Sequence, residues 1–282
     1  MKIFALIICL GCLTTYAFAQ NTDKLIKDNA TMRFYYILAK KKPGENAPYR
    51  TDTMLLDMGT EVSRFYDPAR LTRDSAINKL FNPANQGNIK AMNVFKGENA
   101  KQVTDMPGTV GSNSTEGESY QIIKDRKGNV TVLDYVSNMS PKLRFEENLG
   151  KLNWQLEEGT DTIATYICQK ATLKFRGRNY IAWFAPDIPI NDGPWKFSGL
   201  PGLILKIEDT DLLYSFTLIG MIQPETPLPI VVEKSEYLKI TREDYNKQLK
   251  KKTMGMYVNY TNGVVNLAEI PGKLEIILME LE

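Results

Sequence analysis

The stretch DGPWKFSGLPGLILKI, residues 192–207, joins a turn-rich loop directly to an apolar strand. Its run LPGL at 200–203 has the composition of a type II turn, in which Pro201 fixes φ at about −65° and Gly202 takes the positive φ of the next position. The run LIL at 203–205 follows at once and is typical of a buried strand. We therefore expect the rigid turn to fix the register in which this strand enters its sheet.

The loop before this strand also admits a functional interpretation. Trp195 and Phe197 lie between the turn and an earlier turn signal at 192–194, so they either pack back onto the sheet or line a ligand cleft. Loops held by a rigid scaffold often carry binding residues, whereas Pro-Gly turns beside strands are mostly architectural, and both interpretations remain open. The candidate ligand-binding residues are Trp183, Trp195, Phe197, Gly199, Leu200, Pro201 and Gly202.

Segments rich in β-branched and aromatic residues recur along most of the chain, separated by short turn signals. These strand-like segments are 31–40, 51–59, 61–66, 119–124, 130–136, 152–156, 161–175, 178–186, 203–208, 212–222, 226–240 and 272–282. They do not alternate with helices, as a parallel sheet would require. The sequence therefore predicts a mainly β (α+β) fold: a curved antiparallel sheet, half-barrel-like or a sandwich, with two or three short helices.

Two segments carry helix signals. Residues 67–81 place Pro68 in a first turn that is followed by apolar residues at helical spacing. Thr241 resembles an N-cap with Asp244 in the first turn, and this pattern predicts a helix through 242–257.

The N-terminus has the three parts of a secretory signal peptide: a positively charged second residue, an uncharged apolar run at 3–13, and the small-x-small signal AFA at 17–19. The apolar run is too short for a stable membrane span, which disfavours an uncleaved anchor. A lipoprotein modified at Cys12 would lack the apolar residue that its lipobox needs three positions earlier. We therefore expect cleavage between Ala19 and Gln20 and export to the periplasm or the outer envelope.

The remainder, residues 20–282, is expected to fold as a single β-rich domain. The chain is 43% hydrophobic, which is enough for a proper core. Residues 82–117 are rich in Asn, Gly, Ser and Thr, and they predict a loop-rich insertion with one short helix near 91–95. No segment after the signal peptide is long and apolar enough to cross a membrane.

The chain contains no histidine, which excludes Ser-His-Asp and Cys-His catalysis and metal sites built on histidine. Only Cys168 follows the signal peptide, and its strand-like surroundings favour a small buried hydrophobe over a reactive thiol. The formal net charge of +2 gives no electrostatic footprint for nucleic acid. The remaining routes to catalysis are carboxylates, lysine, tyrosine or a Ser-Lys pair.

Two acidic groups raise the question of a cation, one at 157–161 and one at 208–211. Carboxylate oxygens suit calcium, but both groups lie at predicted turns, where solvated acids are ordinary, and neither has the spacing of an EF-hand. We therefore predict neither a metal nor a cofactor.

The sequence around the opening stretch resembles the GLPGLI family of exported Bacteroidota proteins, which is named for the motif found here, unbroken, at 199–204. The upstream part also fits, with Tyr-x-Cys-x-Lys-Ala at 166–171, an Ala-Trp-Phe strand at 182–184 and the prolines at 189 and 194. The run LLDMGTEVSRFYDPARLTRDS at 55–75 is similar to the N-terminal part of the family.

This resemblance implies an exported β-rich protein and supplies no catalytic residue to carry over, since the function of the family is uncharacterised. The order of strand, proline-rich loop and strand is also similar to the curved half-barrels of lipoprotein carriers, whose concave face binds apolar ligands, as an analogy at the level of the fold. Asp-Ser/Thr-apolar triplets are O-glycosylation signals in Bacteroidota, which makes Thr53, Ser75 and Thr162 candidate glycosylation sites.

Three hypotheses of function follow. The leading one is a non-enzymatic exported protein that binds an apolar or envelope-derived small molecule, such as a lipid, or an envelope protein, on the face near 183–205. The first alternative is a carboxylate-based hydrolase, which would need Asp187, Asp192, Glu208 and Asp211 to converge in a cleft. The second is an accessory subunit of an outer-membrane assembly, which an exposed apolar patch would favour.

Overall fold

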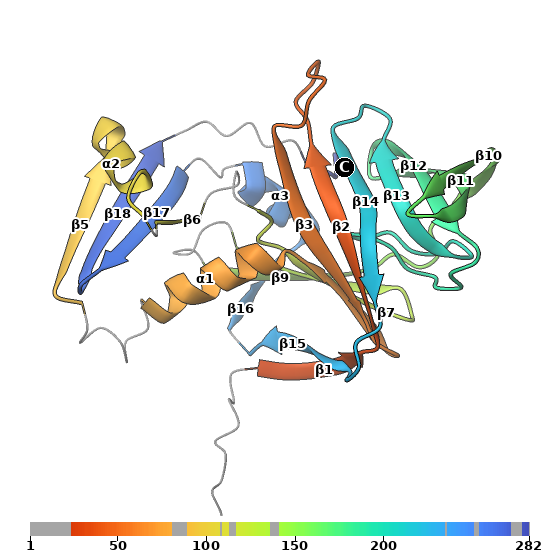
Figure 1. The fold of residues 1–282 in the computed structure, drawn as a ribbon, viewed down its shortest axis with the longest axis horizontal. Coiled ribbons are helices and arrows are strands. Elements are labelled where there is room, and N and C mark those ends of the chain that lie inside the picture. The colour runs from red at the N-terminus through yellow and green to blue at the C-terminus, as the bar shows by residue number, and fades with distance from the viewer. Residues whose placement is uncertain are drawn as a thin grey trace, which may run out of the picture.

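The computed structural model describes residues 24–80, 89–107, 109–112, 117–135, 141–234, 236–250, 254–271 and 278–281. One large open sheet dominates it (Figure 1). Its strands, in spatial order, are β10 (Gln155–Ile163), β11 (Tyr166–Phe175), β12 (Arg178–Ala185), β13 (Leu203–Asp209), β14 (Tyr214–Ile222), β2 (Met32–Lys40), β3 (Arg50–Met58), β4 (Val62–Tyr66), β7 (Gln121–Asp125), β8 (Asn129–Tyr135), β9 (Lys142–Asn148) and β16 (Tyr237–Lys239). Neighbours pair antiparallel except β16 with β9, so the predicted mainly β fold is confirmed.

The large sheet curls around its own core. Leu173 of β11 and Phe145 of β9 lie far apart in the strand order, yet both belong to one buried cluster. In the middle of that cluster the ring of Phe65 meets Tyr36 edge-on at 6.3 Å between centroids and Phe216 at 5.7 Å. β-Bulges, such as the register shift between Trp183 and Phe184, increase the local twist and help the sheet to curve.

The loop at 186–202 packs into this core, as the structural interpretation of the opening stretch predicts. Phe197 is fully buried and contacts the rings of Trp195, Phe175 and Tyr180 at 4.8 to 6.0 Å between centroids. The backbone N–H of Leu203 donates to Ile188 O at 3.0 Å, which ties the start of β13 to the loop.

The predicted turn geometry at Gly202 is wrong. Positive φ occurs at Gly199, at 101°, and not at Gly202. Glycine is needed at 202 for a different reason: a Cβ there would lie 2.3 Å from the carbonyl oxygen of Ala185, far inside van der Waals contact. A close approach of two backbones, rather than an unusual φ, therefore requires this residue.

Two smaller sheets complete the β structure. β1 (Lys24–Ala30) pairs antiparallel with β15 (Leu228–Glu233). The second sheet has the order β5 (Ala91–Lys96), β18 (Val264–Pro271), β17 (Met254–Thr261) and β6 (Val110–Ser112), and it lies to the left of the large sheet in Figure 1. The 3-10 turn η2 (Gly97–Asn99) and helix α2 (Ala100–Thr104) follow β5, and α2 packs on this sheet through a small core of Ala100, Val103 and Ala268.

This second sheet corrects two predictions. Residues 91–95 form a strand rather than a short helix, because β18 supplies backbone partners along the whole of β5. The C-terminal helix is α3 (Arg242–Lys250), which ends before β17 begins at Met254 instead of running to 257. Residues 82–88 of the predicted insertion, and residues 272–277 of the predicted last strand, lie outside the described residues, and 278–281 form no strand.

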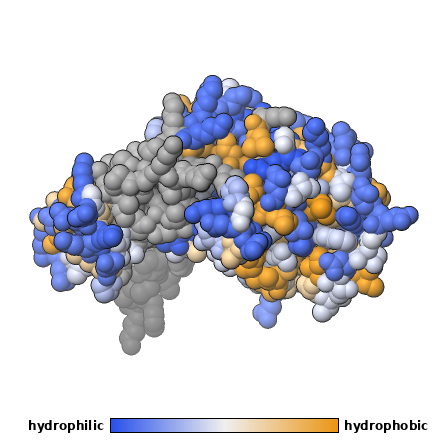
Figure 2. Space-filling view, turned by 90° about the horizontal axis from the view of Figure 1, so that it is seen from above, coloured by the Kyte–Doolittle hydropathy of each residue, from blue (hydrophilic) through white to orange (hydrophobic). Residues whose placement is uncertain are grey.

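The remaining helix predictions are confirmed. Helix α1 (Pro68–Leu80) starts at the predicted proline. At the start of α3 the Asp244 N–H donates to Thr241 Oγ1 at 3.1 Å, which is the expected N-cap bond. None of the helices in the described ranges has the length and apolarity that a membrane span needs. Seen from above, apolar residues on the surface of the large sheet are interspersed with hydrophilic ones (Figure 2).

Candidate functional site

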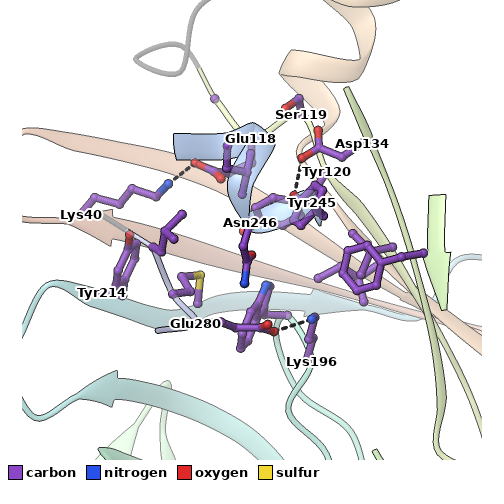
Figure 3. Close-up of a pocket in the computed structure, with 18 residues that line it drawn as sticks. Lys40, Glu118, Ser119, Tyr120, Asp134, Lys196, Tyr214, Tyr245, Asn246 and Glu280 are labelled. Carbon is purple, nitrogen blue, oxygen red and sulfur yellow. Dashed lines mark hydrogen bonds and ion pairs between the residues drawn. The ribbon is translucent and has the colours of Figure 1, made fainter. Parts of the chain in front are cut away.

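A cavity of about 110 Å³ lies on the concave side of the large sheet (Figure 3). Its walls come from β2, β7, β8, β9 and β14, from the segment at 117–120, from the loop at 186–202, from α3, and from residues 278–280. The apolar part of the lining consists of Ile122, Val132, Phe145, Trp195, Leu249, Leu278 and Met279. The cavity therefore forms only where segments from both ends of the chain meet.

Tyr120 is the lining residue that stands out chemically. It is 9% exposed, and its hydroxyl has no hydrogen-bond partner in the part of the chain that the structure describes. A buried polar group without a partner costs about 1–3 kcal/mol, so native proteins rarely keep one. Burial also raises the pKa of Tyr120 well above its ordinary value, which keeps the hydroxyl protonated and able to donate.

A compact group of charges forms the wall beside Tyr120. The Lys40 ammonium contacts the Glu118 carboxylate, which also contacts Arg50, and Arg50 donates to Asp52 at 2.6 Å. Burial lowers the pKa of Lys40 well below its usual range, and the nearby Arg50 cation adds to this effect. Lys40 also lies 5.5 Å from the ring centroid of Tyr214, another lining residue.

Helix α3 also lines the cavity, next to Tyr120 and Glu118 (Figure 3). The Tyr245 hydroxyl donates to Asp134 of β8, and both residues are buried. Burial and the Asp134 carboxylate raise the pKa of Tyr245 well above its ordinary value. The next residue, Asn246, points its amide into the cavity toward Glu280 (Figure 3).

Lys196 lies at the bottom of the cavity in Figure 3 and is 3% exposed. Its ammonium contacts Glu147 at 2.5 Å and also Glu280, so two carboxylates compensate one buried cation. Its nitrogen lies 5.0 Å from the ring centroid of Phe145 and 5.2 Å from that of Trp195. These contacts connect the loop at 186–202 to β9 and to the C-terminal segment.

The C-terminal segment 278–281 is held in place as a strap by side chains of the sheet. Arg178 donates to Leu278 O at 2.9 and 3.1 Å, and the Tyr180 hydroxyl donates to Met279 O at 2.9 Å. The Leu281 N–H donates to Arg176 O at 2.9 Å. The strap thus fixes three lining residues, Leu278, Met279 and Glu280, against the cavity.

Of the predicted ligand-binding residues, the cavity contains Trp195. Phe197 and Leu200 are buried in the core, and Gly202 is buried where β13 begins. A Cβ added at Gly199 would lie 3.5 Å from the indole nitrogen of Trp154. That nitrogen donates a hydrogen bond to Ser198 O. Trp183 is partly buried on β12, and Pro201 is exposed. The structure thus places most of this set around the turn rather than in one cleft.

The acids predicted for a hydrolase have other surroundings. Asp192 is buried and contacts Lys124 at 2.5 Å, Glu208 contacts Lys206 at 3.0 Å, and Asp187 is exposed. None of these, nor Asp211, is among the lining residues of the cavity described above. The described residues also contain no group of three or more acids or cysteines placed to hold a metal.

The remaining candidates are single residues. Thr53, Ser75 and Thr162 are all exposed, on β3, α1 and β10 respectively. Cys168 is buried in the core, and burial raises the pKa of its thiol. Its burial agrees with the structural interpretation of this residue.

The sequence offered little signal for the cavity. Tyr120 opens a predicted strand and Lys40 ends another, and neither position differs from an ordinary strand end. Their role depends on contacts between segments that are distant in sequence, such as Lys40 with Glu118. A buried lysine, tyrosine and carboxylate become a recognisable group only once the sheet has curled.

In comparisons with known proteins, part of the sequence matches a family whose function is unknown. Residues 176–206 match the family described as "Protein of unknown function (Porph_ging)", a range that includes the motif at 199–204. No curated protein matches the sequence. Two crystal forms of PNGF-II are similar in structure, with TM-scores of 0.49 and 0.48 at 11% and 10% identity. Each similarity covers 82% of this chain and 35% of the PNGF-II chain, so the chain spans little more than a third of that protein.

Proposed function

We propose that this protein binds a small, neutral, amphipathic molecule, or one such group of a larger molecule, in the cavity beneath the C-terminal strap. The observation that carries this proposal is the buried Tyr120 hydroxyl, which lines the cavity and has no hydrogen-bond partner among the described residues. A ligand that hydrogen-bonds to it would remove the cost of its burial. Binding energy would thus come from a group that the folded protein leaves unsatisfied.

The size of the cavity limits the ligand. An apolar cavity of about 150 Å³ accommodates benzene in another protein, and this one has a volume of about 110 Å³. Drug-sized ligands need pockets of roughly 300 Å³ or more. The cavity is therefore too small to enclose a whole ring compound, and it suits a short chain or one end of a larger molecule whose remainder extends through the open side of the cavity.

The charges of the lining favour a neutral ligand. Lys40 already contacts Glu118, and Lys196 already contacts Glu147 and Glu280. Asp134 accepts the hydrogen bond of Tyr245. A charged ligand would have to break one of these buried contacts, which leaves an uncompensated charge and costs several kcal/mol, about 3–5.

The apolar part of the ligand would pack against Phe145, Trp195 and Leu249, while its polar end would reach Tyr120 and Asn246. This arrangement supports a binding role in an exported protein, as the signal peptide predicts. The proposed site includes Trp195, which the sequence also predicted. Its other residues lie on the concave face of the sheet and not in the motif at 199–204.

Benzyl alcohol is a suitable probe because it is neutral and combines one ring with one hydroxyl. With about eight non-hydrogen atoms contributing about 0.5 kcal/mol each, its affinity should be about millimolar. NMR titration of the labelled protein should give saturable shifts that cluster at Tyr120, Trp195 and Asn246.

A variant with a filled cavity shows whether benzyl alcohol binds in the cavity or at another place on the protein. Leu249 lines the cavity from α3 and is partly buried, so Leu249→Trp would fill the cavity from its rim. The shifts should disappear in this variant while the rest of the spectrum stays native. Saturable shifts that map to another surface, or that persist in Leu249→Trp, would refute the proposed site.

A further inference from the structure

We propose that Lys40 is a carbonyl-capturing residue, which forms an imine with an aldehyde or ketone held in the cavity. This inference rests on the proposed function, because the carbonyl compound would occupy the same cavity as the neutral ligand. It goes beyond the proposed function because the ligand would carry a carbonyl group and the protein would bind that group covalently. The geometry that supports it is the contrast between Lys40, which is partly buried, and two buried lysines, Lys124 and Lys196.

Lys124 and Lys196 are fully engaged by acceptors. The Lys124 ammonium donates to Gly193 O at 2.6 Å and Phe197 O at 3.2 Å, contacts Asp192 at 2.5 Å, and is not among the cavity-lining residues. Lys196 lines the cavity but lies between two carboxylates, Glu147 and Glu280. Burial lowers the pKa of Lys124 too, but Lys124 does not line the cavity, and the Lys196 ammonium is occupied by its two carboxylates.

Lys40 has different surroundings. It lines the cavity and contacts one carboxylate, Glu118, which it shares with the Arg50 guanidinium. Its side chain is 13% exposed. Burial and a neighbouring cation are the two conditions that favour the neutral, nucleophilic amine of a lysine, and the direction of its pKa shift agrees with them.

Glu118, which contacts Lys40, and Tyr120, which lines the same cavity, supply the groups that imine formation needs. The ammonium proton passes to Glu118, the carboxylate in contact with it, and the free amine attacks the carbonyl carbon. A C–N bond forms, the π pair of the carbonyl moves to oxygen, and the Tyr120 hydroxyl donates a hydrogen bond to that oxygen. Proton transfer from nitrogen to oxygen then gives the carbinolamine.

Loss of water completes the step. The carbinolamine C–O bond breaks as Glu118 returns a proton to the leaving hydroxyl, water departs, and the nitrogen lone pair forms the C=N bond. One ammonium group and one carbonyl thus give one protonated imine and one water, the Glu118 carboxylate is regenerated, and no oxidant or reductant takes part. The reaction is reversible, so this site would hold a carbonyl compound rather than consume it.

Benzaldehyde tests the proposal because it matches benzyl alcohol in size and differs in its carbonyl. The full chain is incubated with benzaldehyde and cyanoborohydride, which reduces any imine to a stable amine, and the modified lysines are identified by peptide mapping. Lys40 should be modified at least about tenfold faster than Lys124, Lys196 and the exposed lysines. Benzyl alcohol should slow the Lys40 adduct and leave the surface lysines unaffected.

Two variants test whether the fast reaction depends on the Lys40 amine. Lys40→Arg keeps the charge beside Glu118 and should abolish the fast adduct, whereas Lys247→Arg, at an exposed position of α3, should not. If benzyl alcohol binds but Lys40 reacts no faster than exposed lysines, imine capture is refuted and the binding function stands. If neither compound enters the cavity, the proposed function fails and this inference fails with it.

Discussion

At the scale of single residues, Gly202 and Tyr120 show how one neighbouring group determines what a position requires. Gly202 must lack a side chain because the Ala185 carbonyl approaches it, although its φ is ordinary. The sequence predicted that Gly202 must be glycine because of a positive φ, and that reason is wrong. The composition of a Pro-Gly turn does not reveal which backbone segment packs against the turn. Tyr120 carried no signal at all, because a missing partner is a property of the folded environment.

Gly202→Ala should destabilise the protein by about 1–3 kcal/mol or more, because the new Cβ meets backbone atoms that have little freedom to move. Gly220→Ala is the control, because Gly220 lies at a register shift of β14 and no atom lies within 4 Å of the added Cβ. Its effect should stay within about 0.5 kcal/mol. Urea denaturation measures both, and similar losses for the two variants would contradict the close-approach explanation.

At the scale of elements, local pattern predicted most hairpins and failed for strands with distant partners. The predicted single strand 161–175 is wrong, because the chain turns at Ala164 and Thr165, both at positive φ, between β10 and β11. β3 with β4, β11 with β12 and β13 with β14 were predicted because alternation and turn signals lie within each pair. β5 was missed because β18, its one partner among the described strands, comes much later in the chain, and the residues of β5 are mostly exposed. The same reason hid the cavity, whose walls come from segments that only the curled sheet brings together.

The C-terminal strap is the element whose removal should matter most for the cavity. Glu280 contacts Lys196 and Arg242 and is 5% exposed, so Glu280→Gln leaves Lys196 with Glu147 alone. We expect a loss of about 1.5–3 kcal/mol, as for a buried hydrogen bond to a charged group. Urea denaturation provides the measurement.

Glu146→Gln is the control, because Glu146 is exposed on β9 and its contact with Arg144 is a surface pair. Such pairs contribute little, so stability should change by less than about 1 kcal/mol. Equal effects of the two substitutions would show that the strap is not anchored through Glu280.

At the scale of the whole molecule, the curled sheet encloses an unusual number of tyrosines in and beside its core. Six buried ones have raised pKa values, with burial as the largest cause in each: Tyr36, Tyr66, Tyr120, Tyr180, Tyr214 and Tyr245. For Tyr66 the pKa rises from 10.0 to about 12. The folded state therefore keeps these phenolic protons to higher pH than the unfolded chain does.

This difference predicts cooperative alkaline unfolding. The stability that these groups contribute is fully present below pH 10.0, the ordinary value, and is lost as the pH rises toward about 12. Phenolate absorbance from the buried tyrosines should appear in one step, together with the loss of near-ultraviolet circular dichroism. A gradual rise of all the phenolate signal near pH 10.0, with the fold intact, would contradict the burial described here.

The substitution Tyr120→Phe tests the central claim most directly, because it removes the unpartnered hydroxyl and little else. Tyr245→Phe is its control, since that hydroxyl donates to Asp134 and its loss should destabilise by about 1–3 kcal/mol. Unfolding free energy and benzyl alcohol affinity are measured for both variants. We predict that Tyr120→Phe raises stability by about 1 kcal/mol and weakens binding about tenfold. If Tyr120→Phe lowered the unfolding free energy, or left the affinity for benzyl alcohol unchanged, the result would contradict a site in which the Tyr120 hydroxyl is unpartnered until a ligand binds.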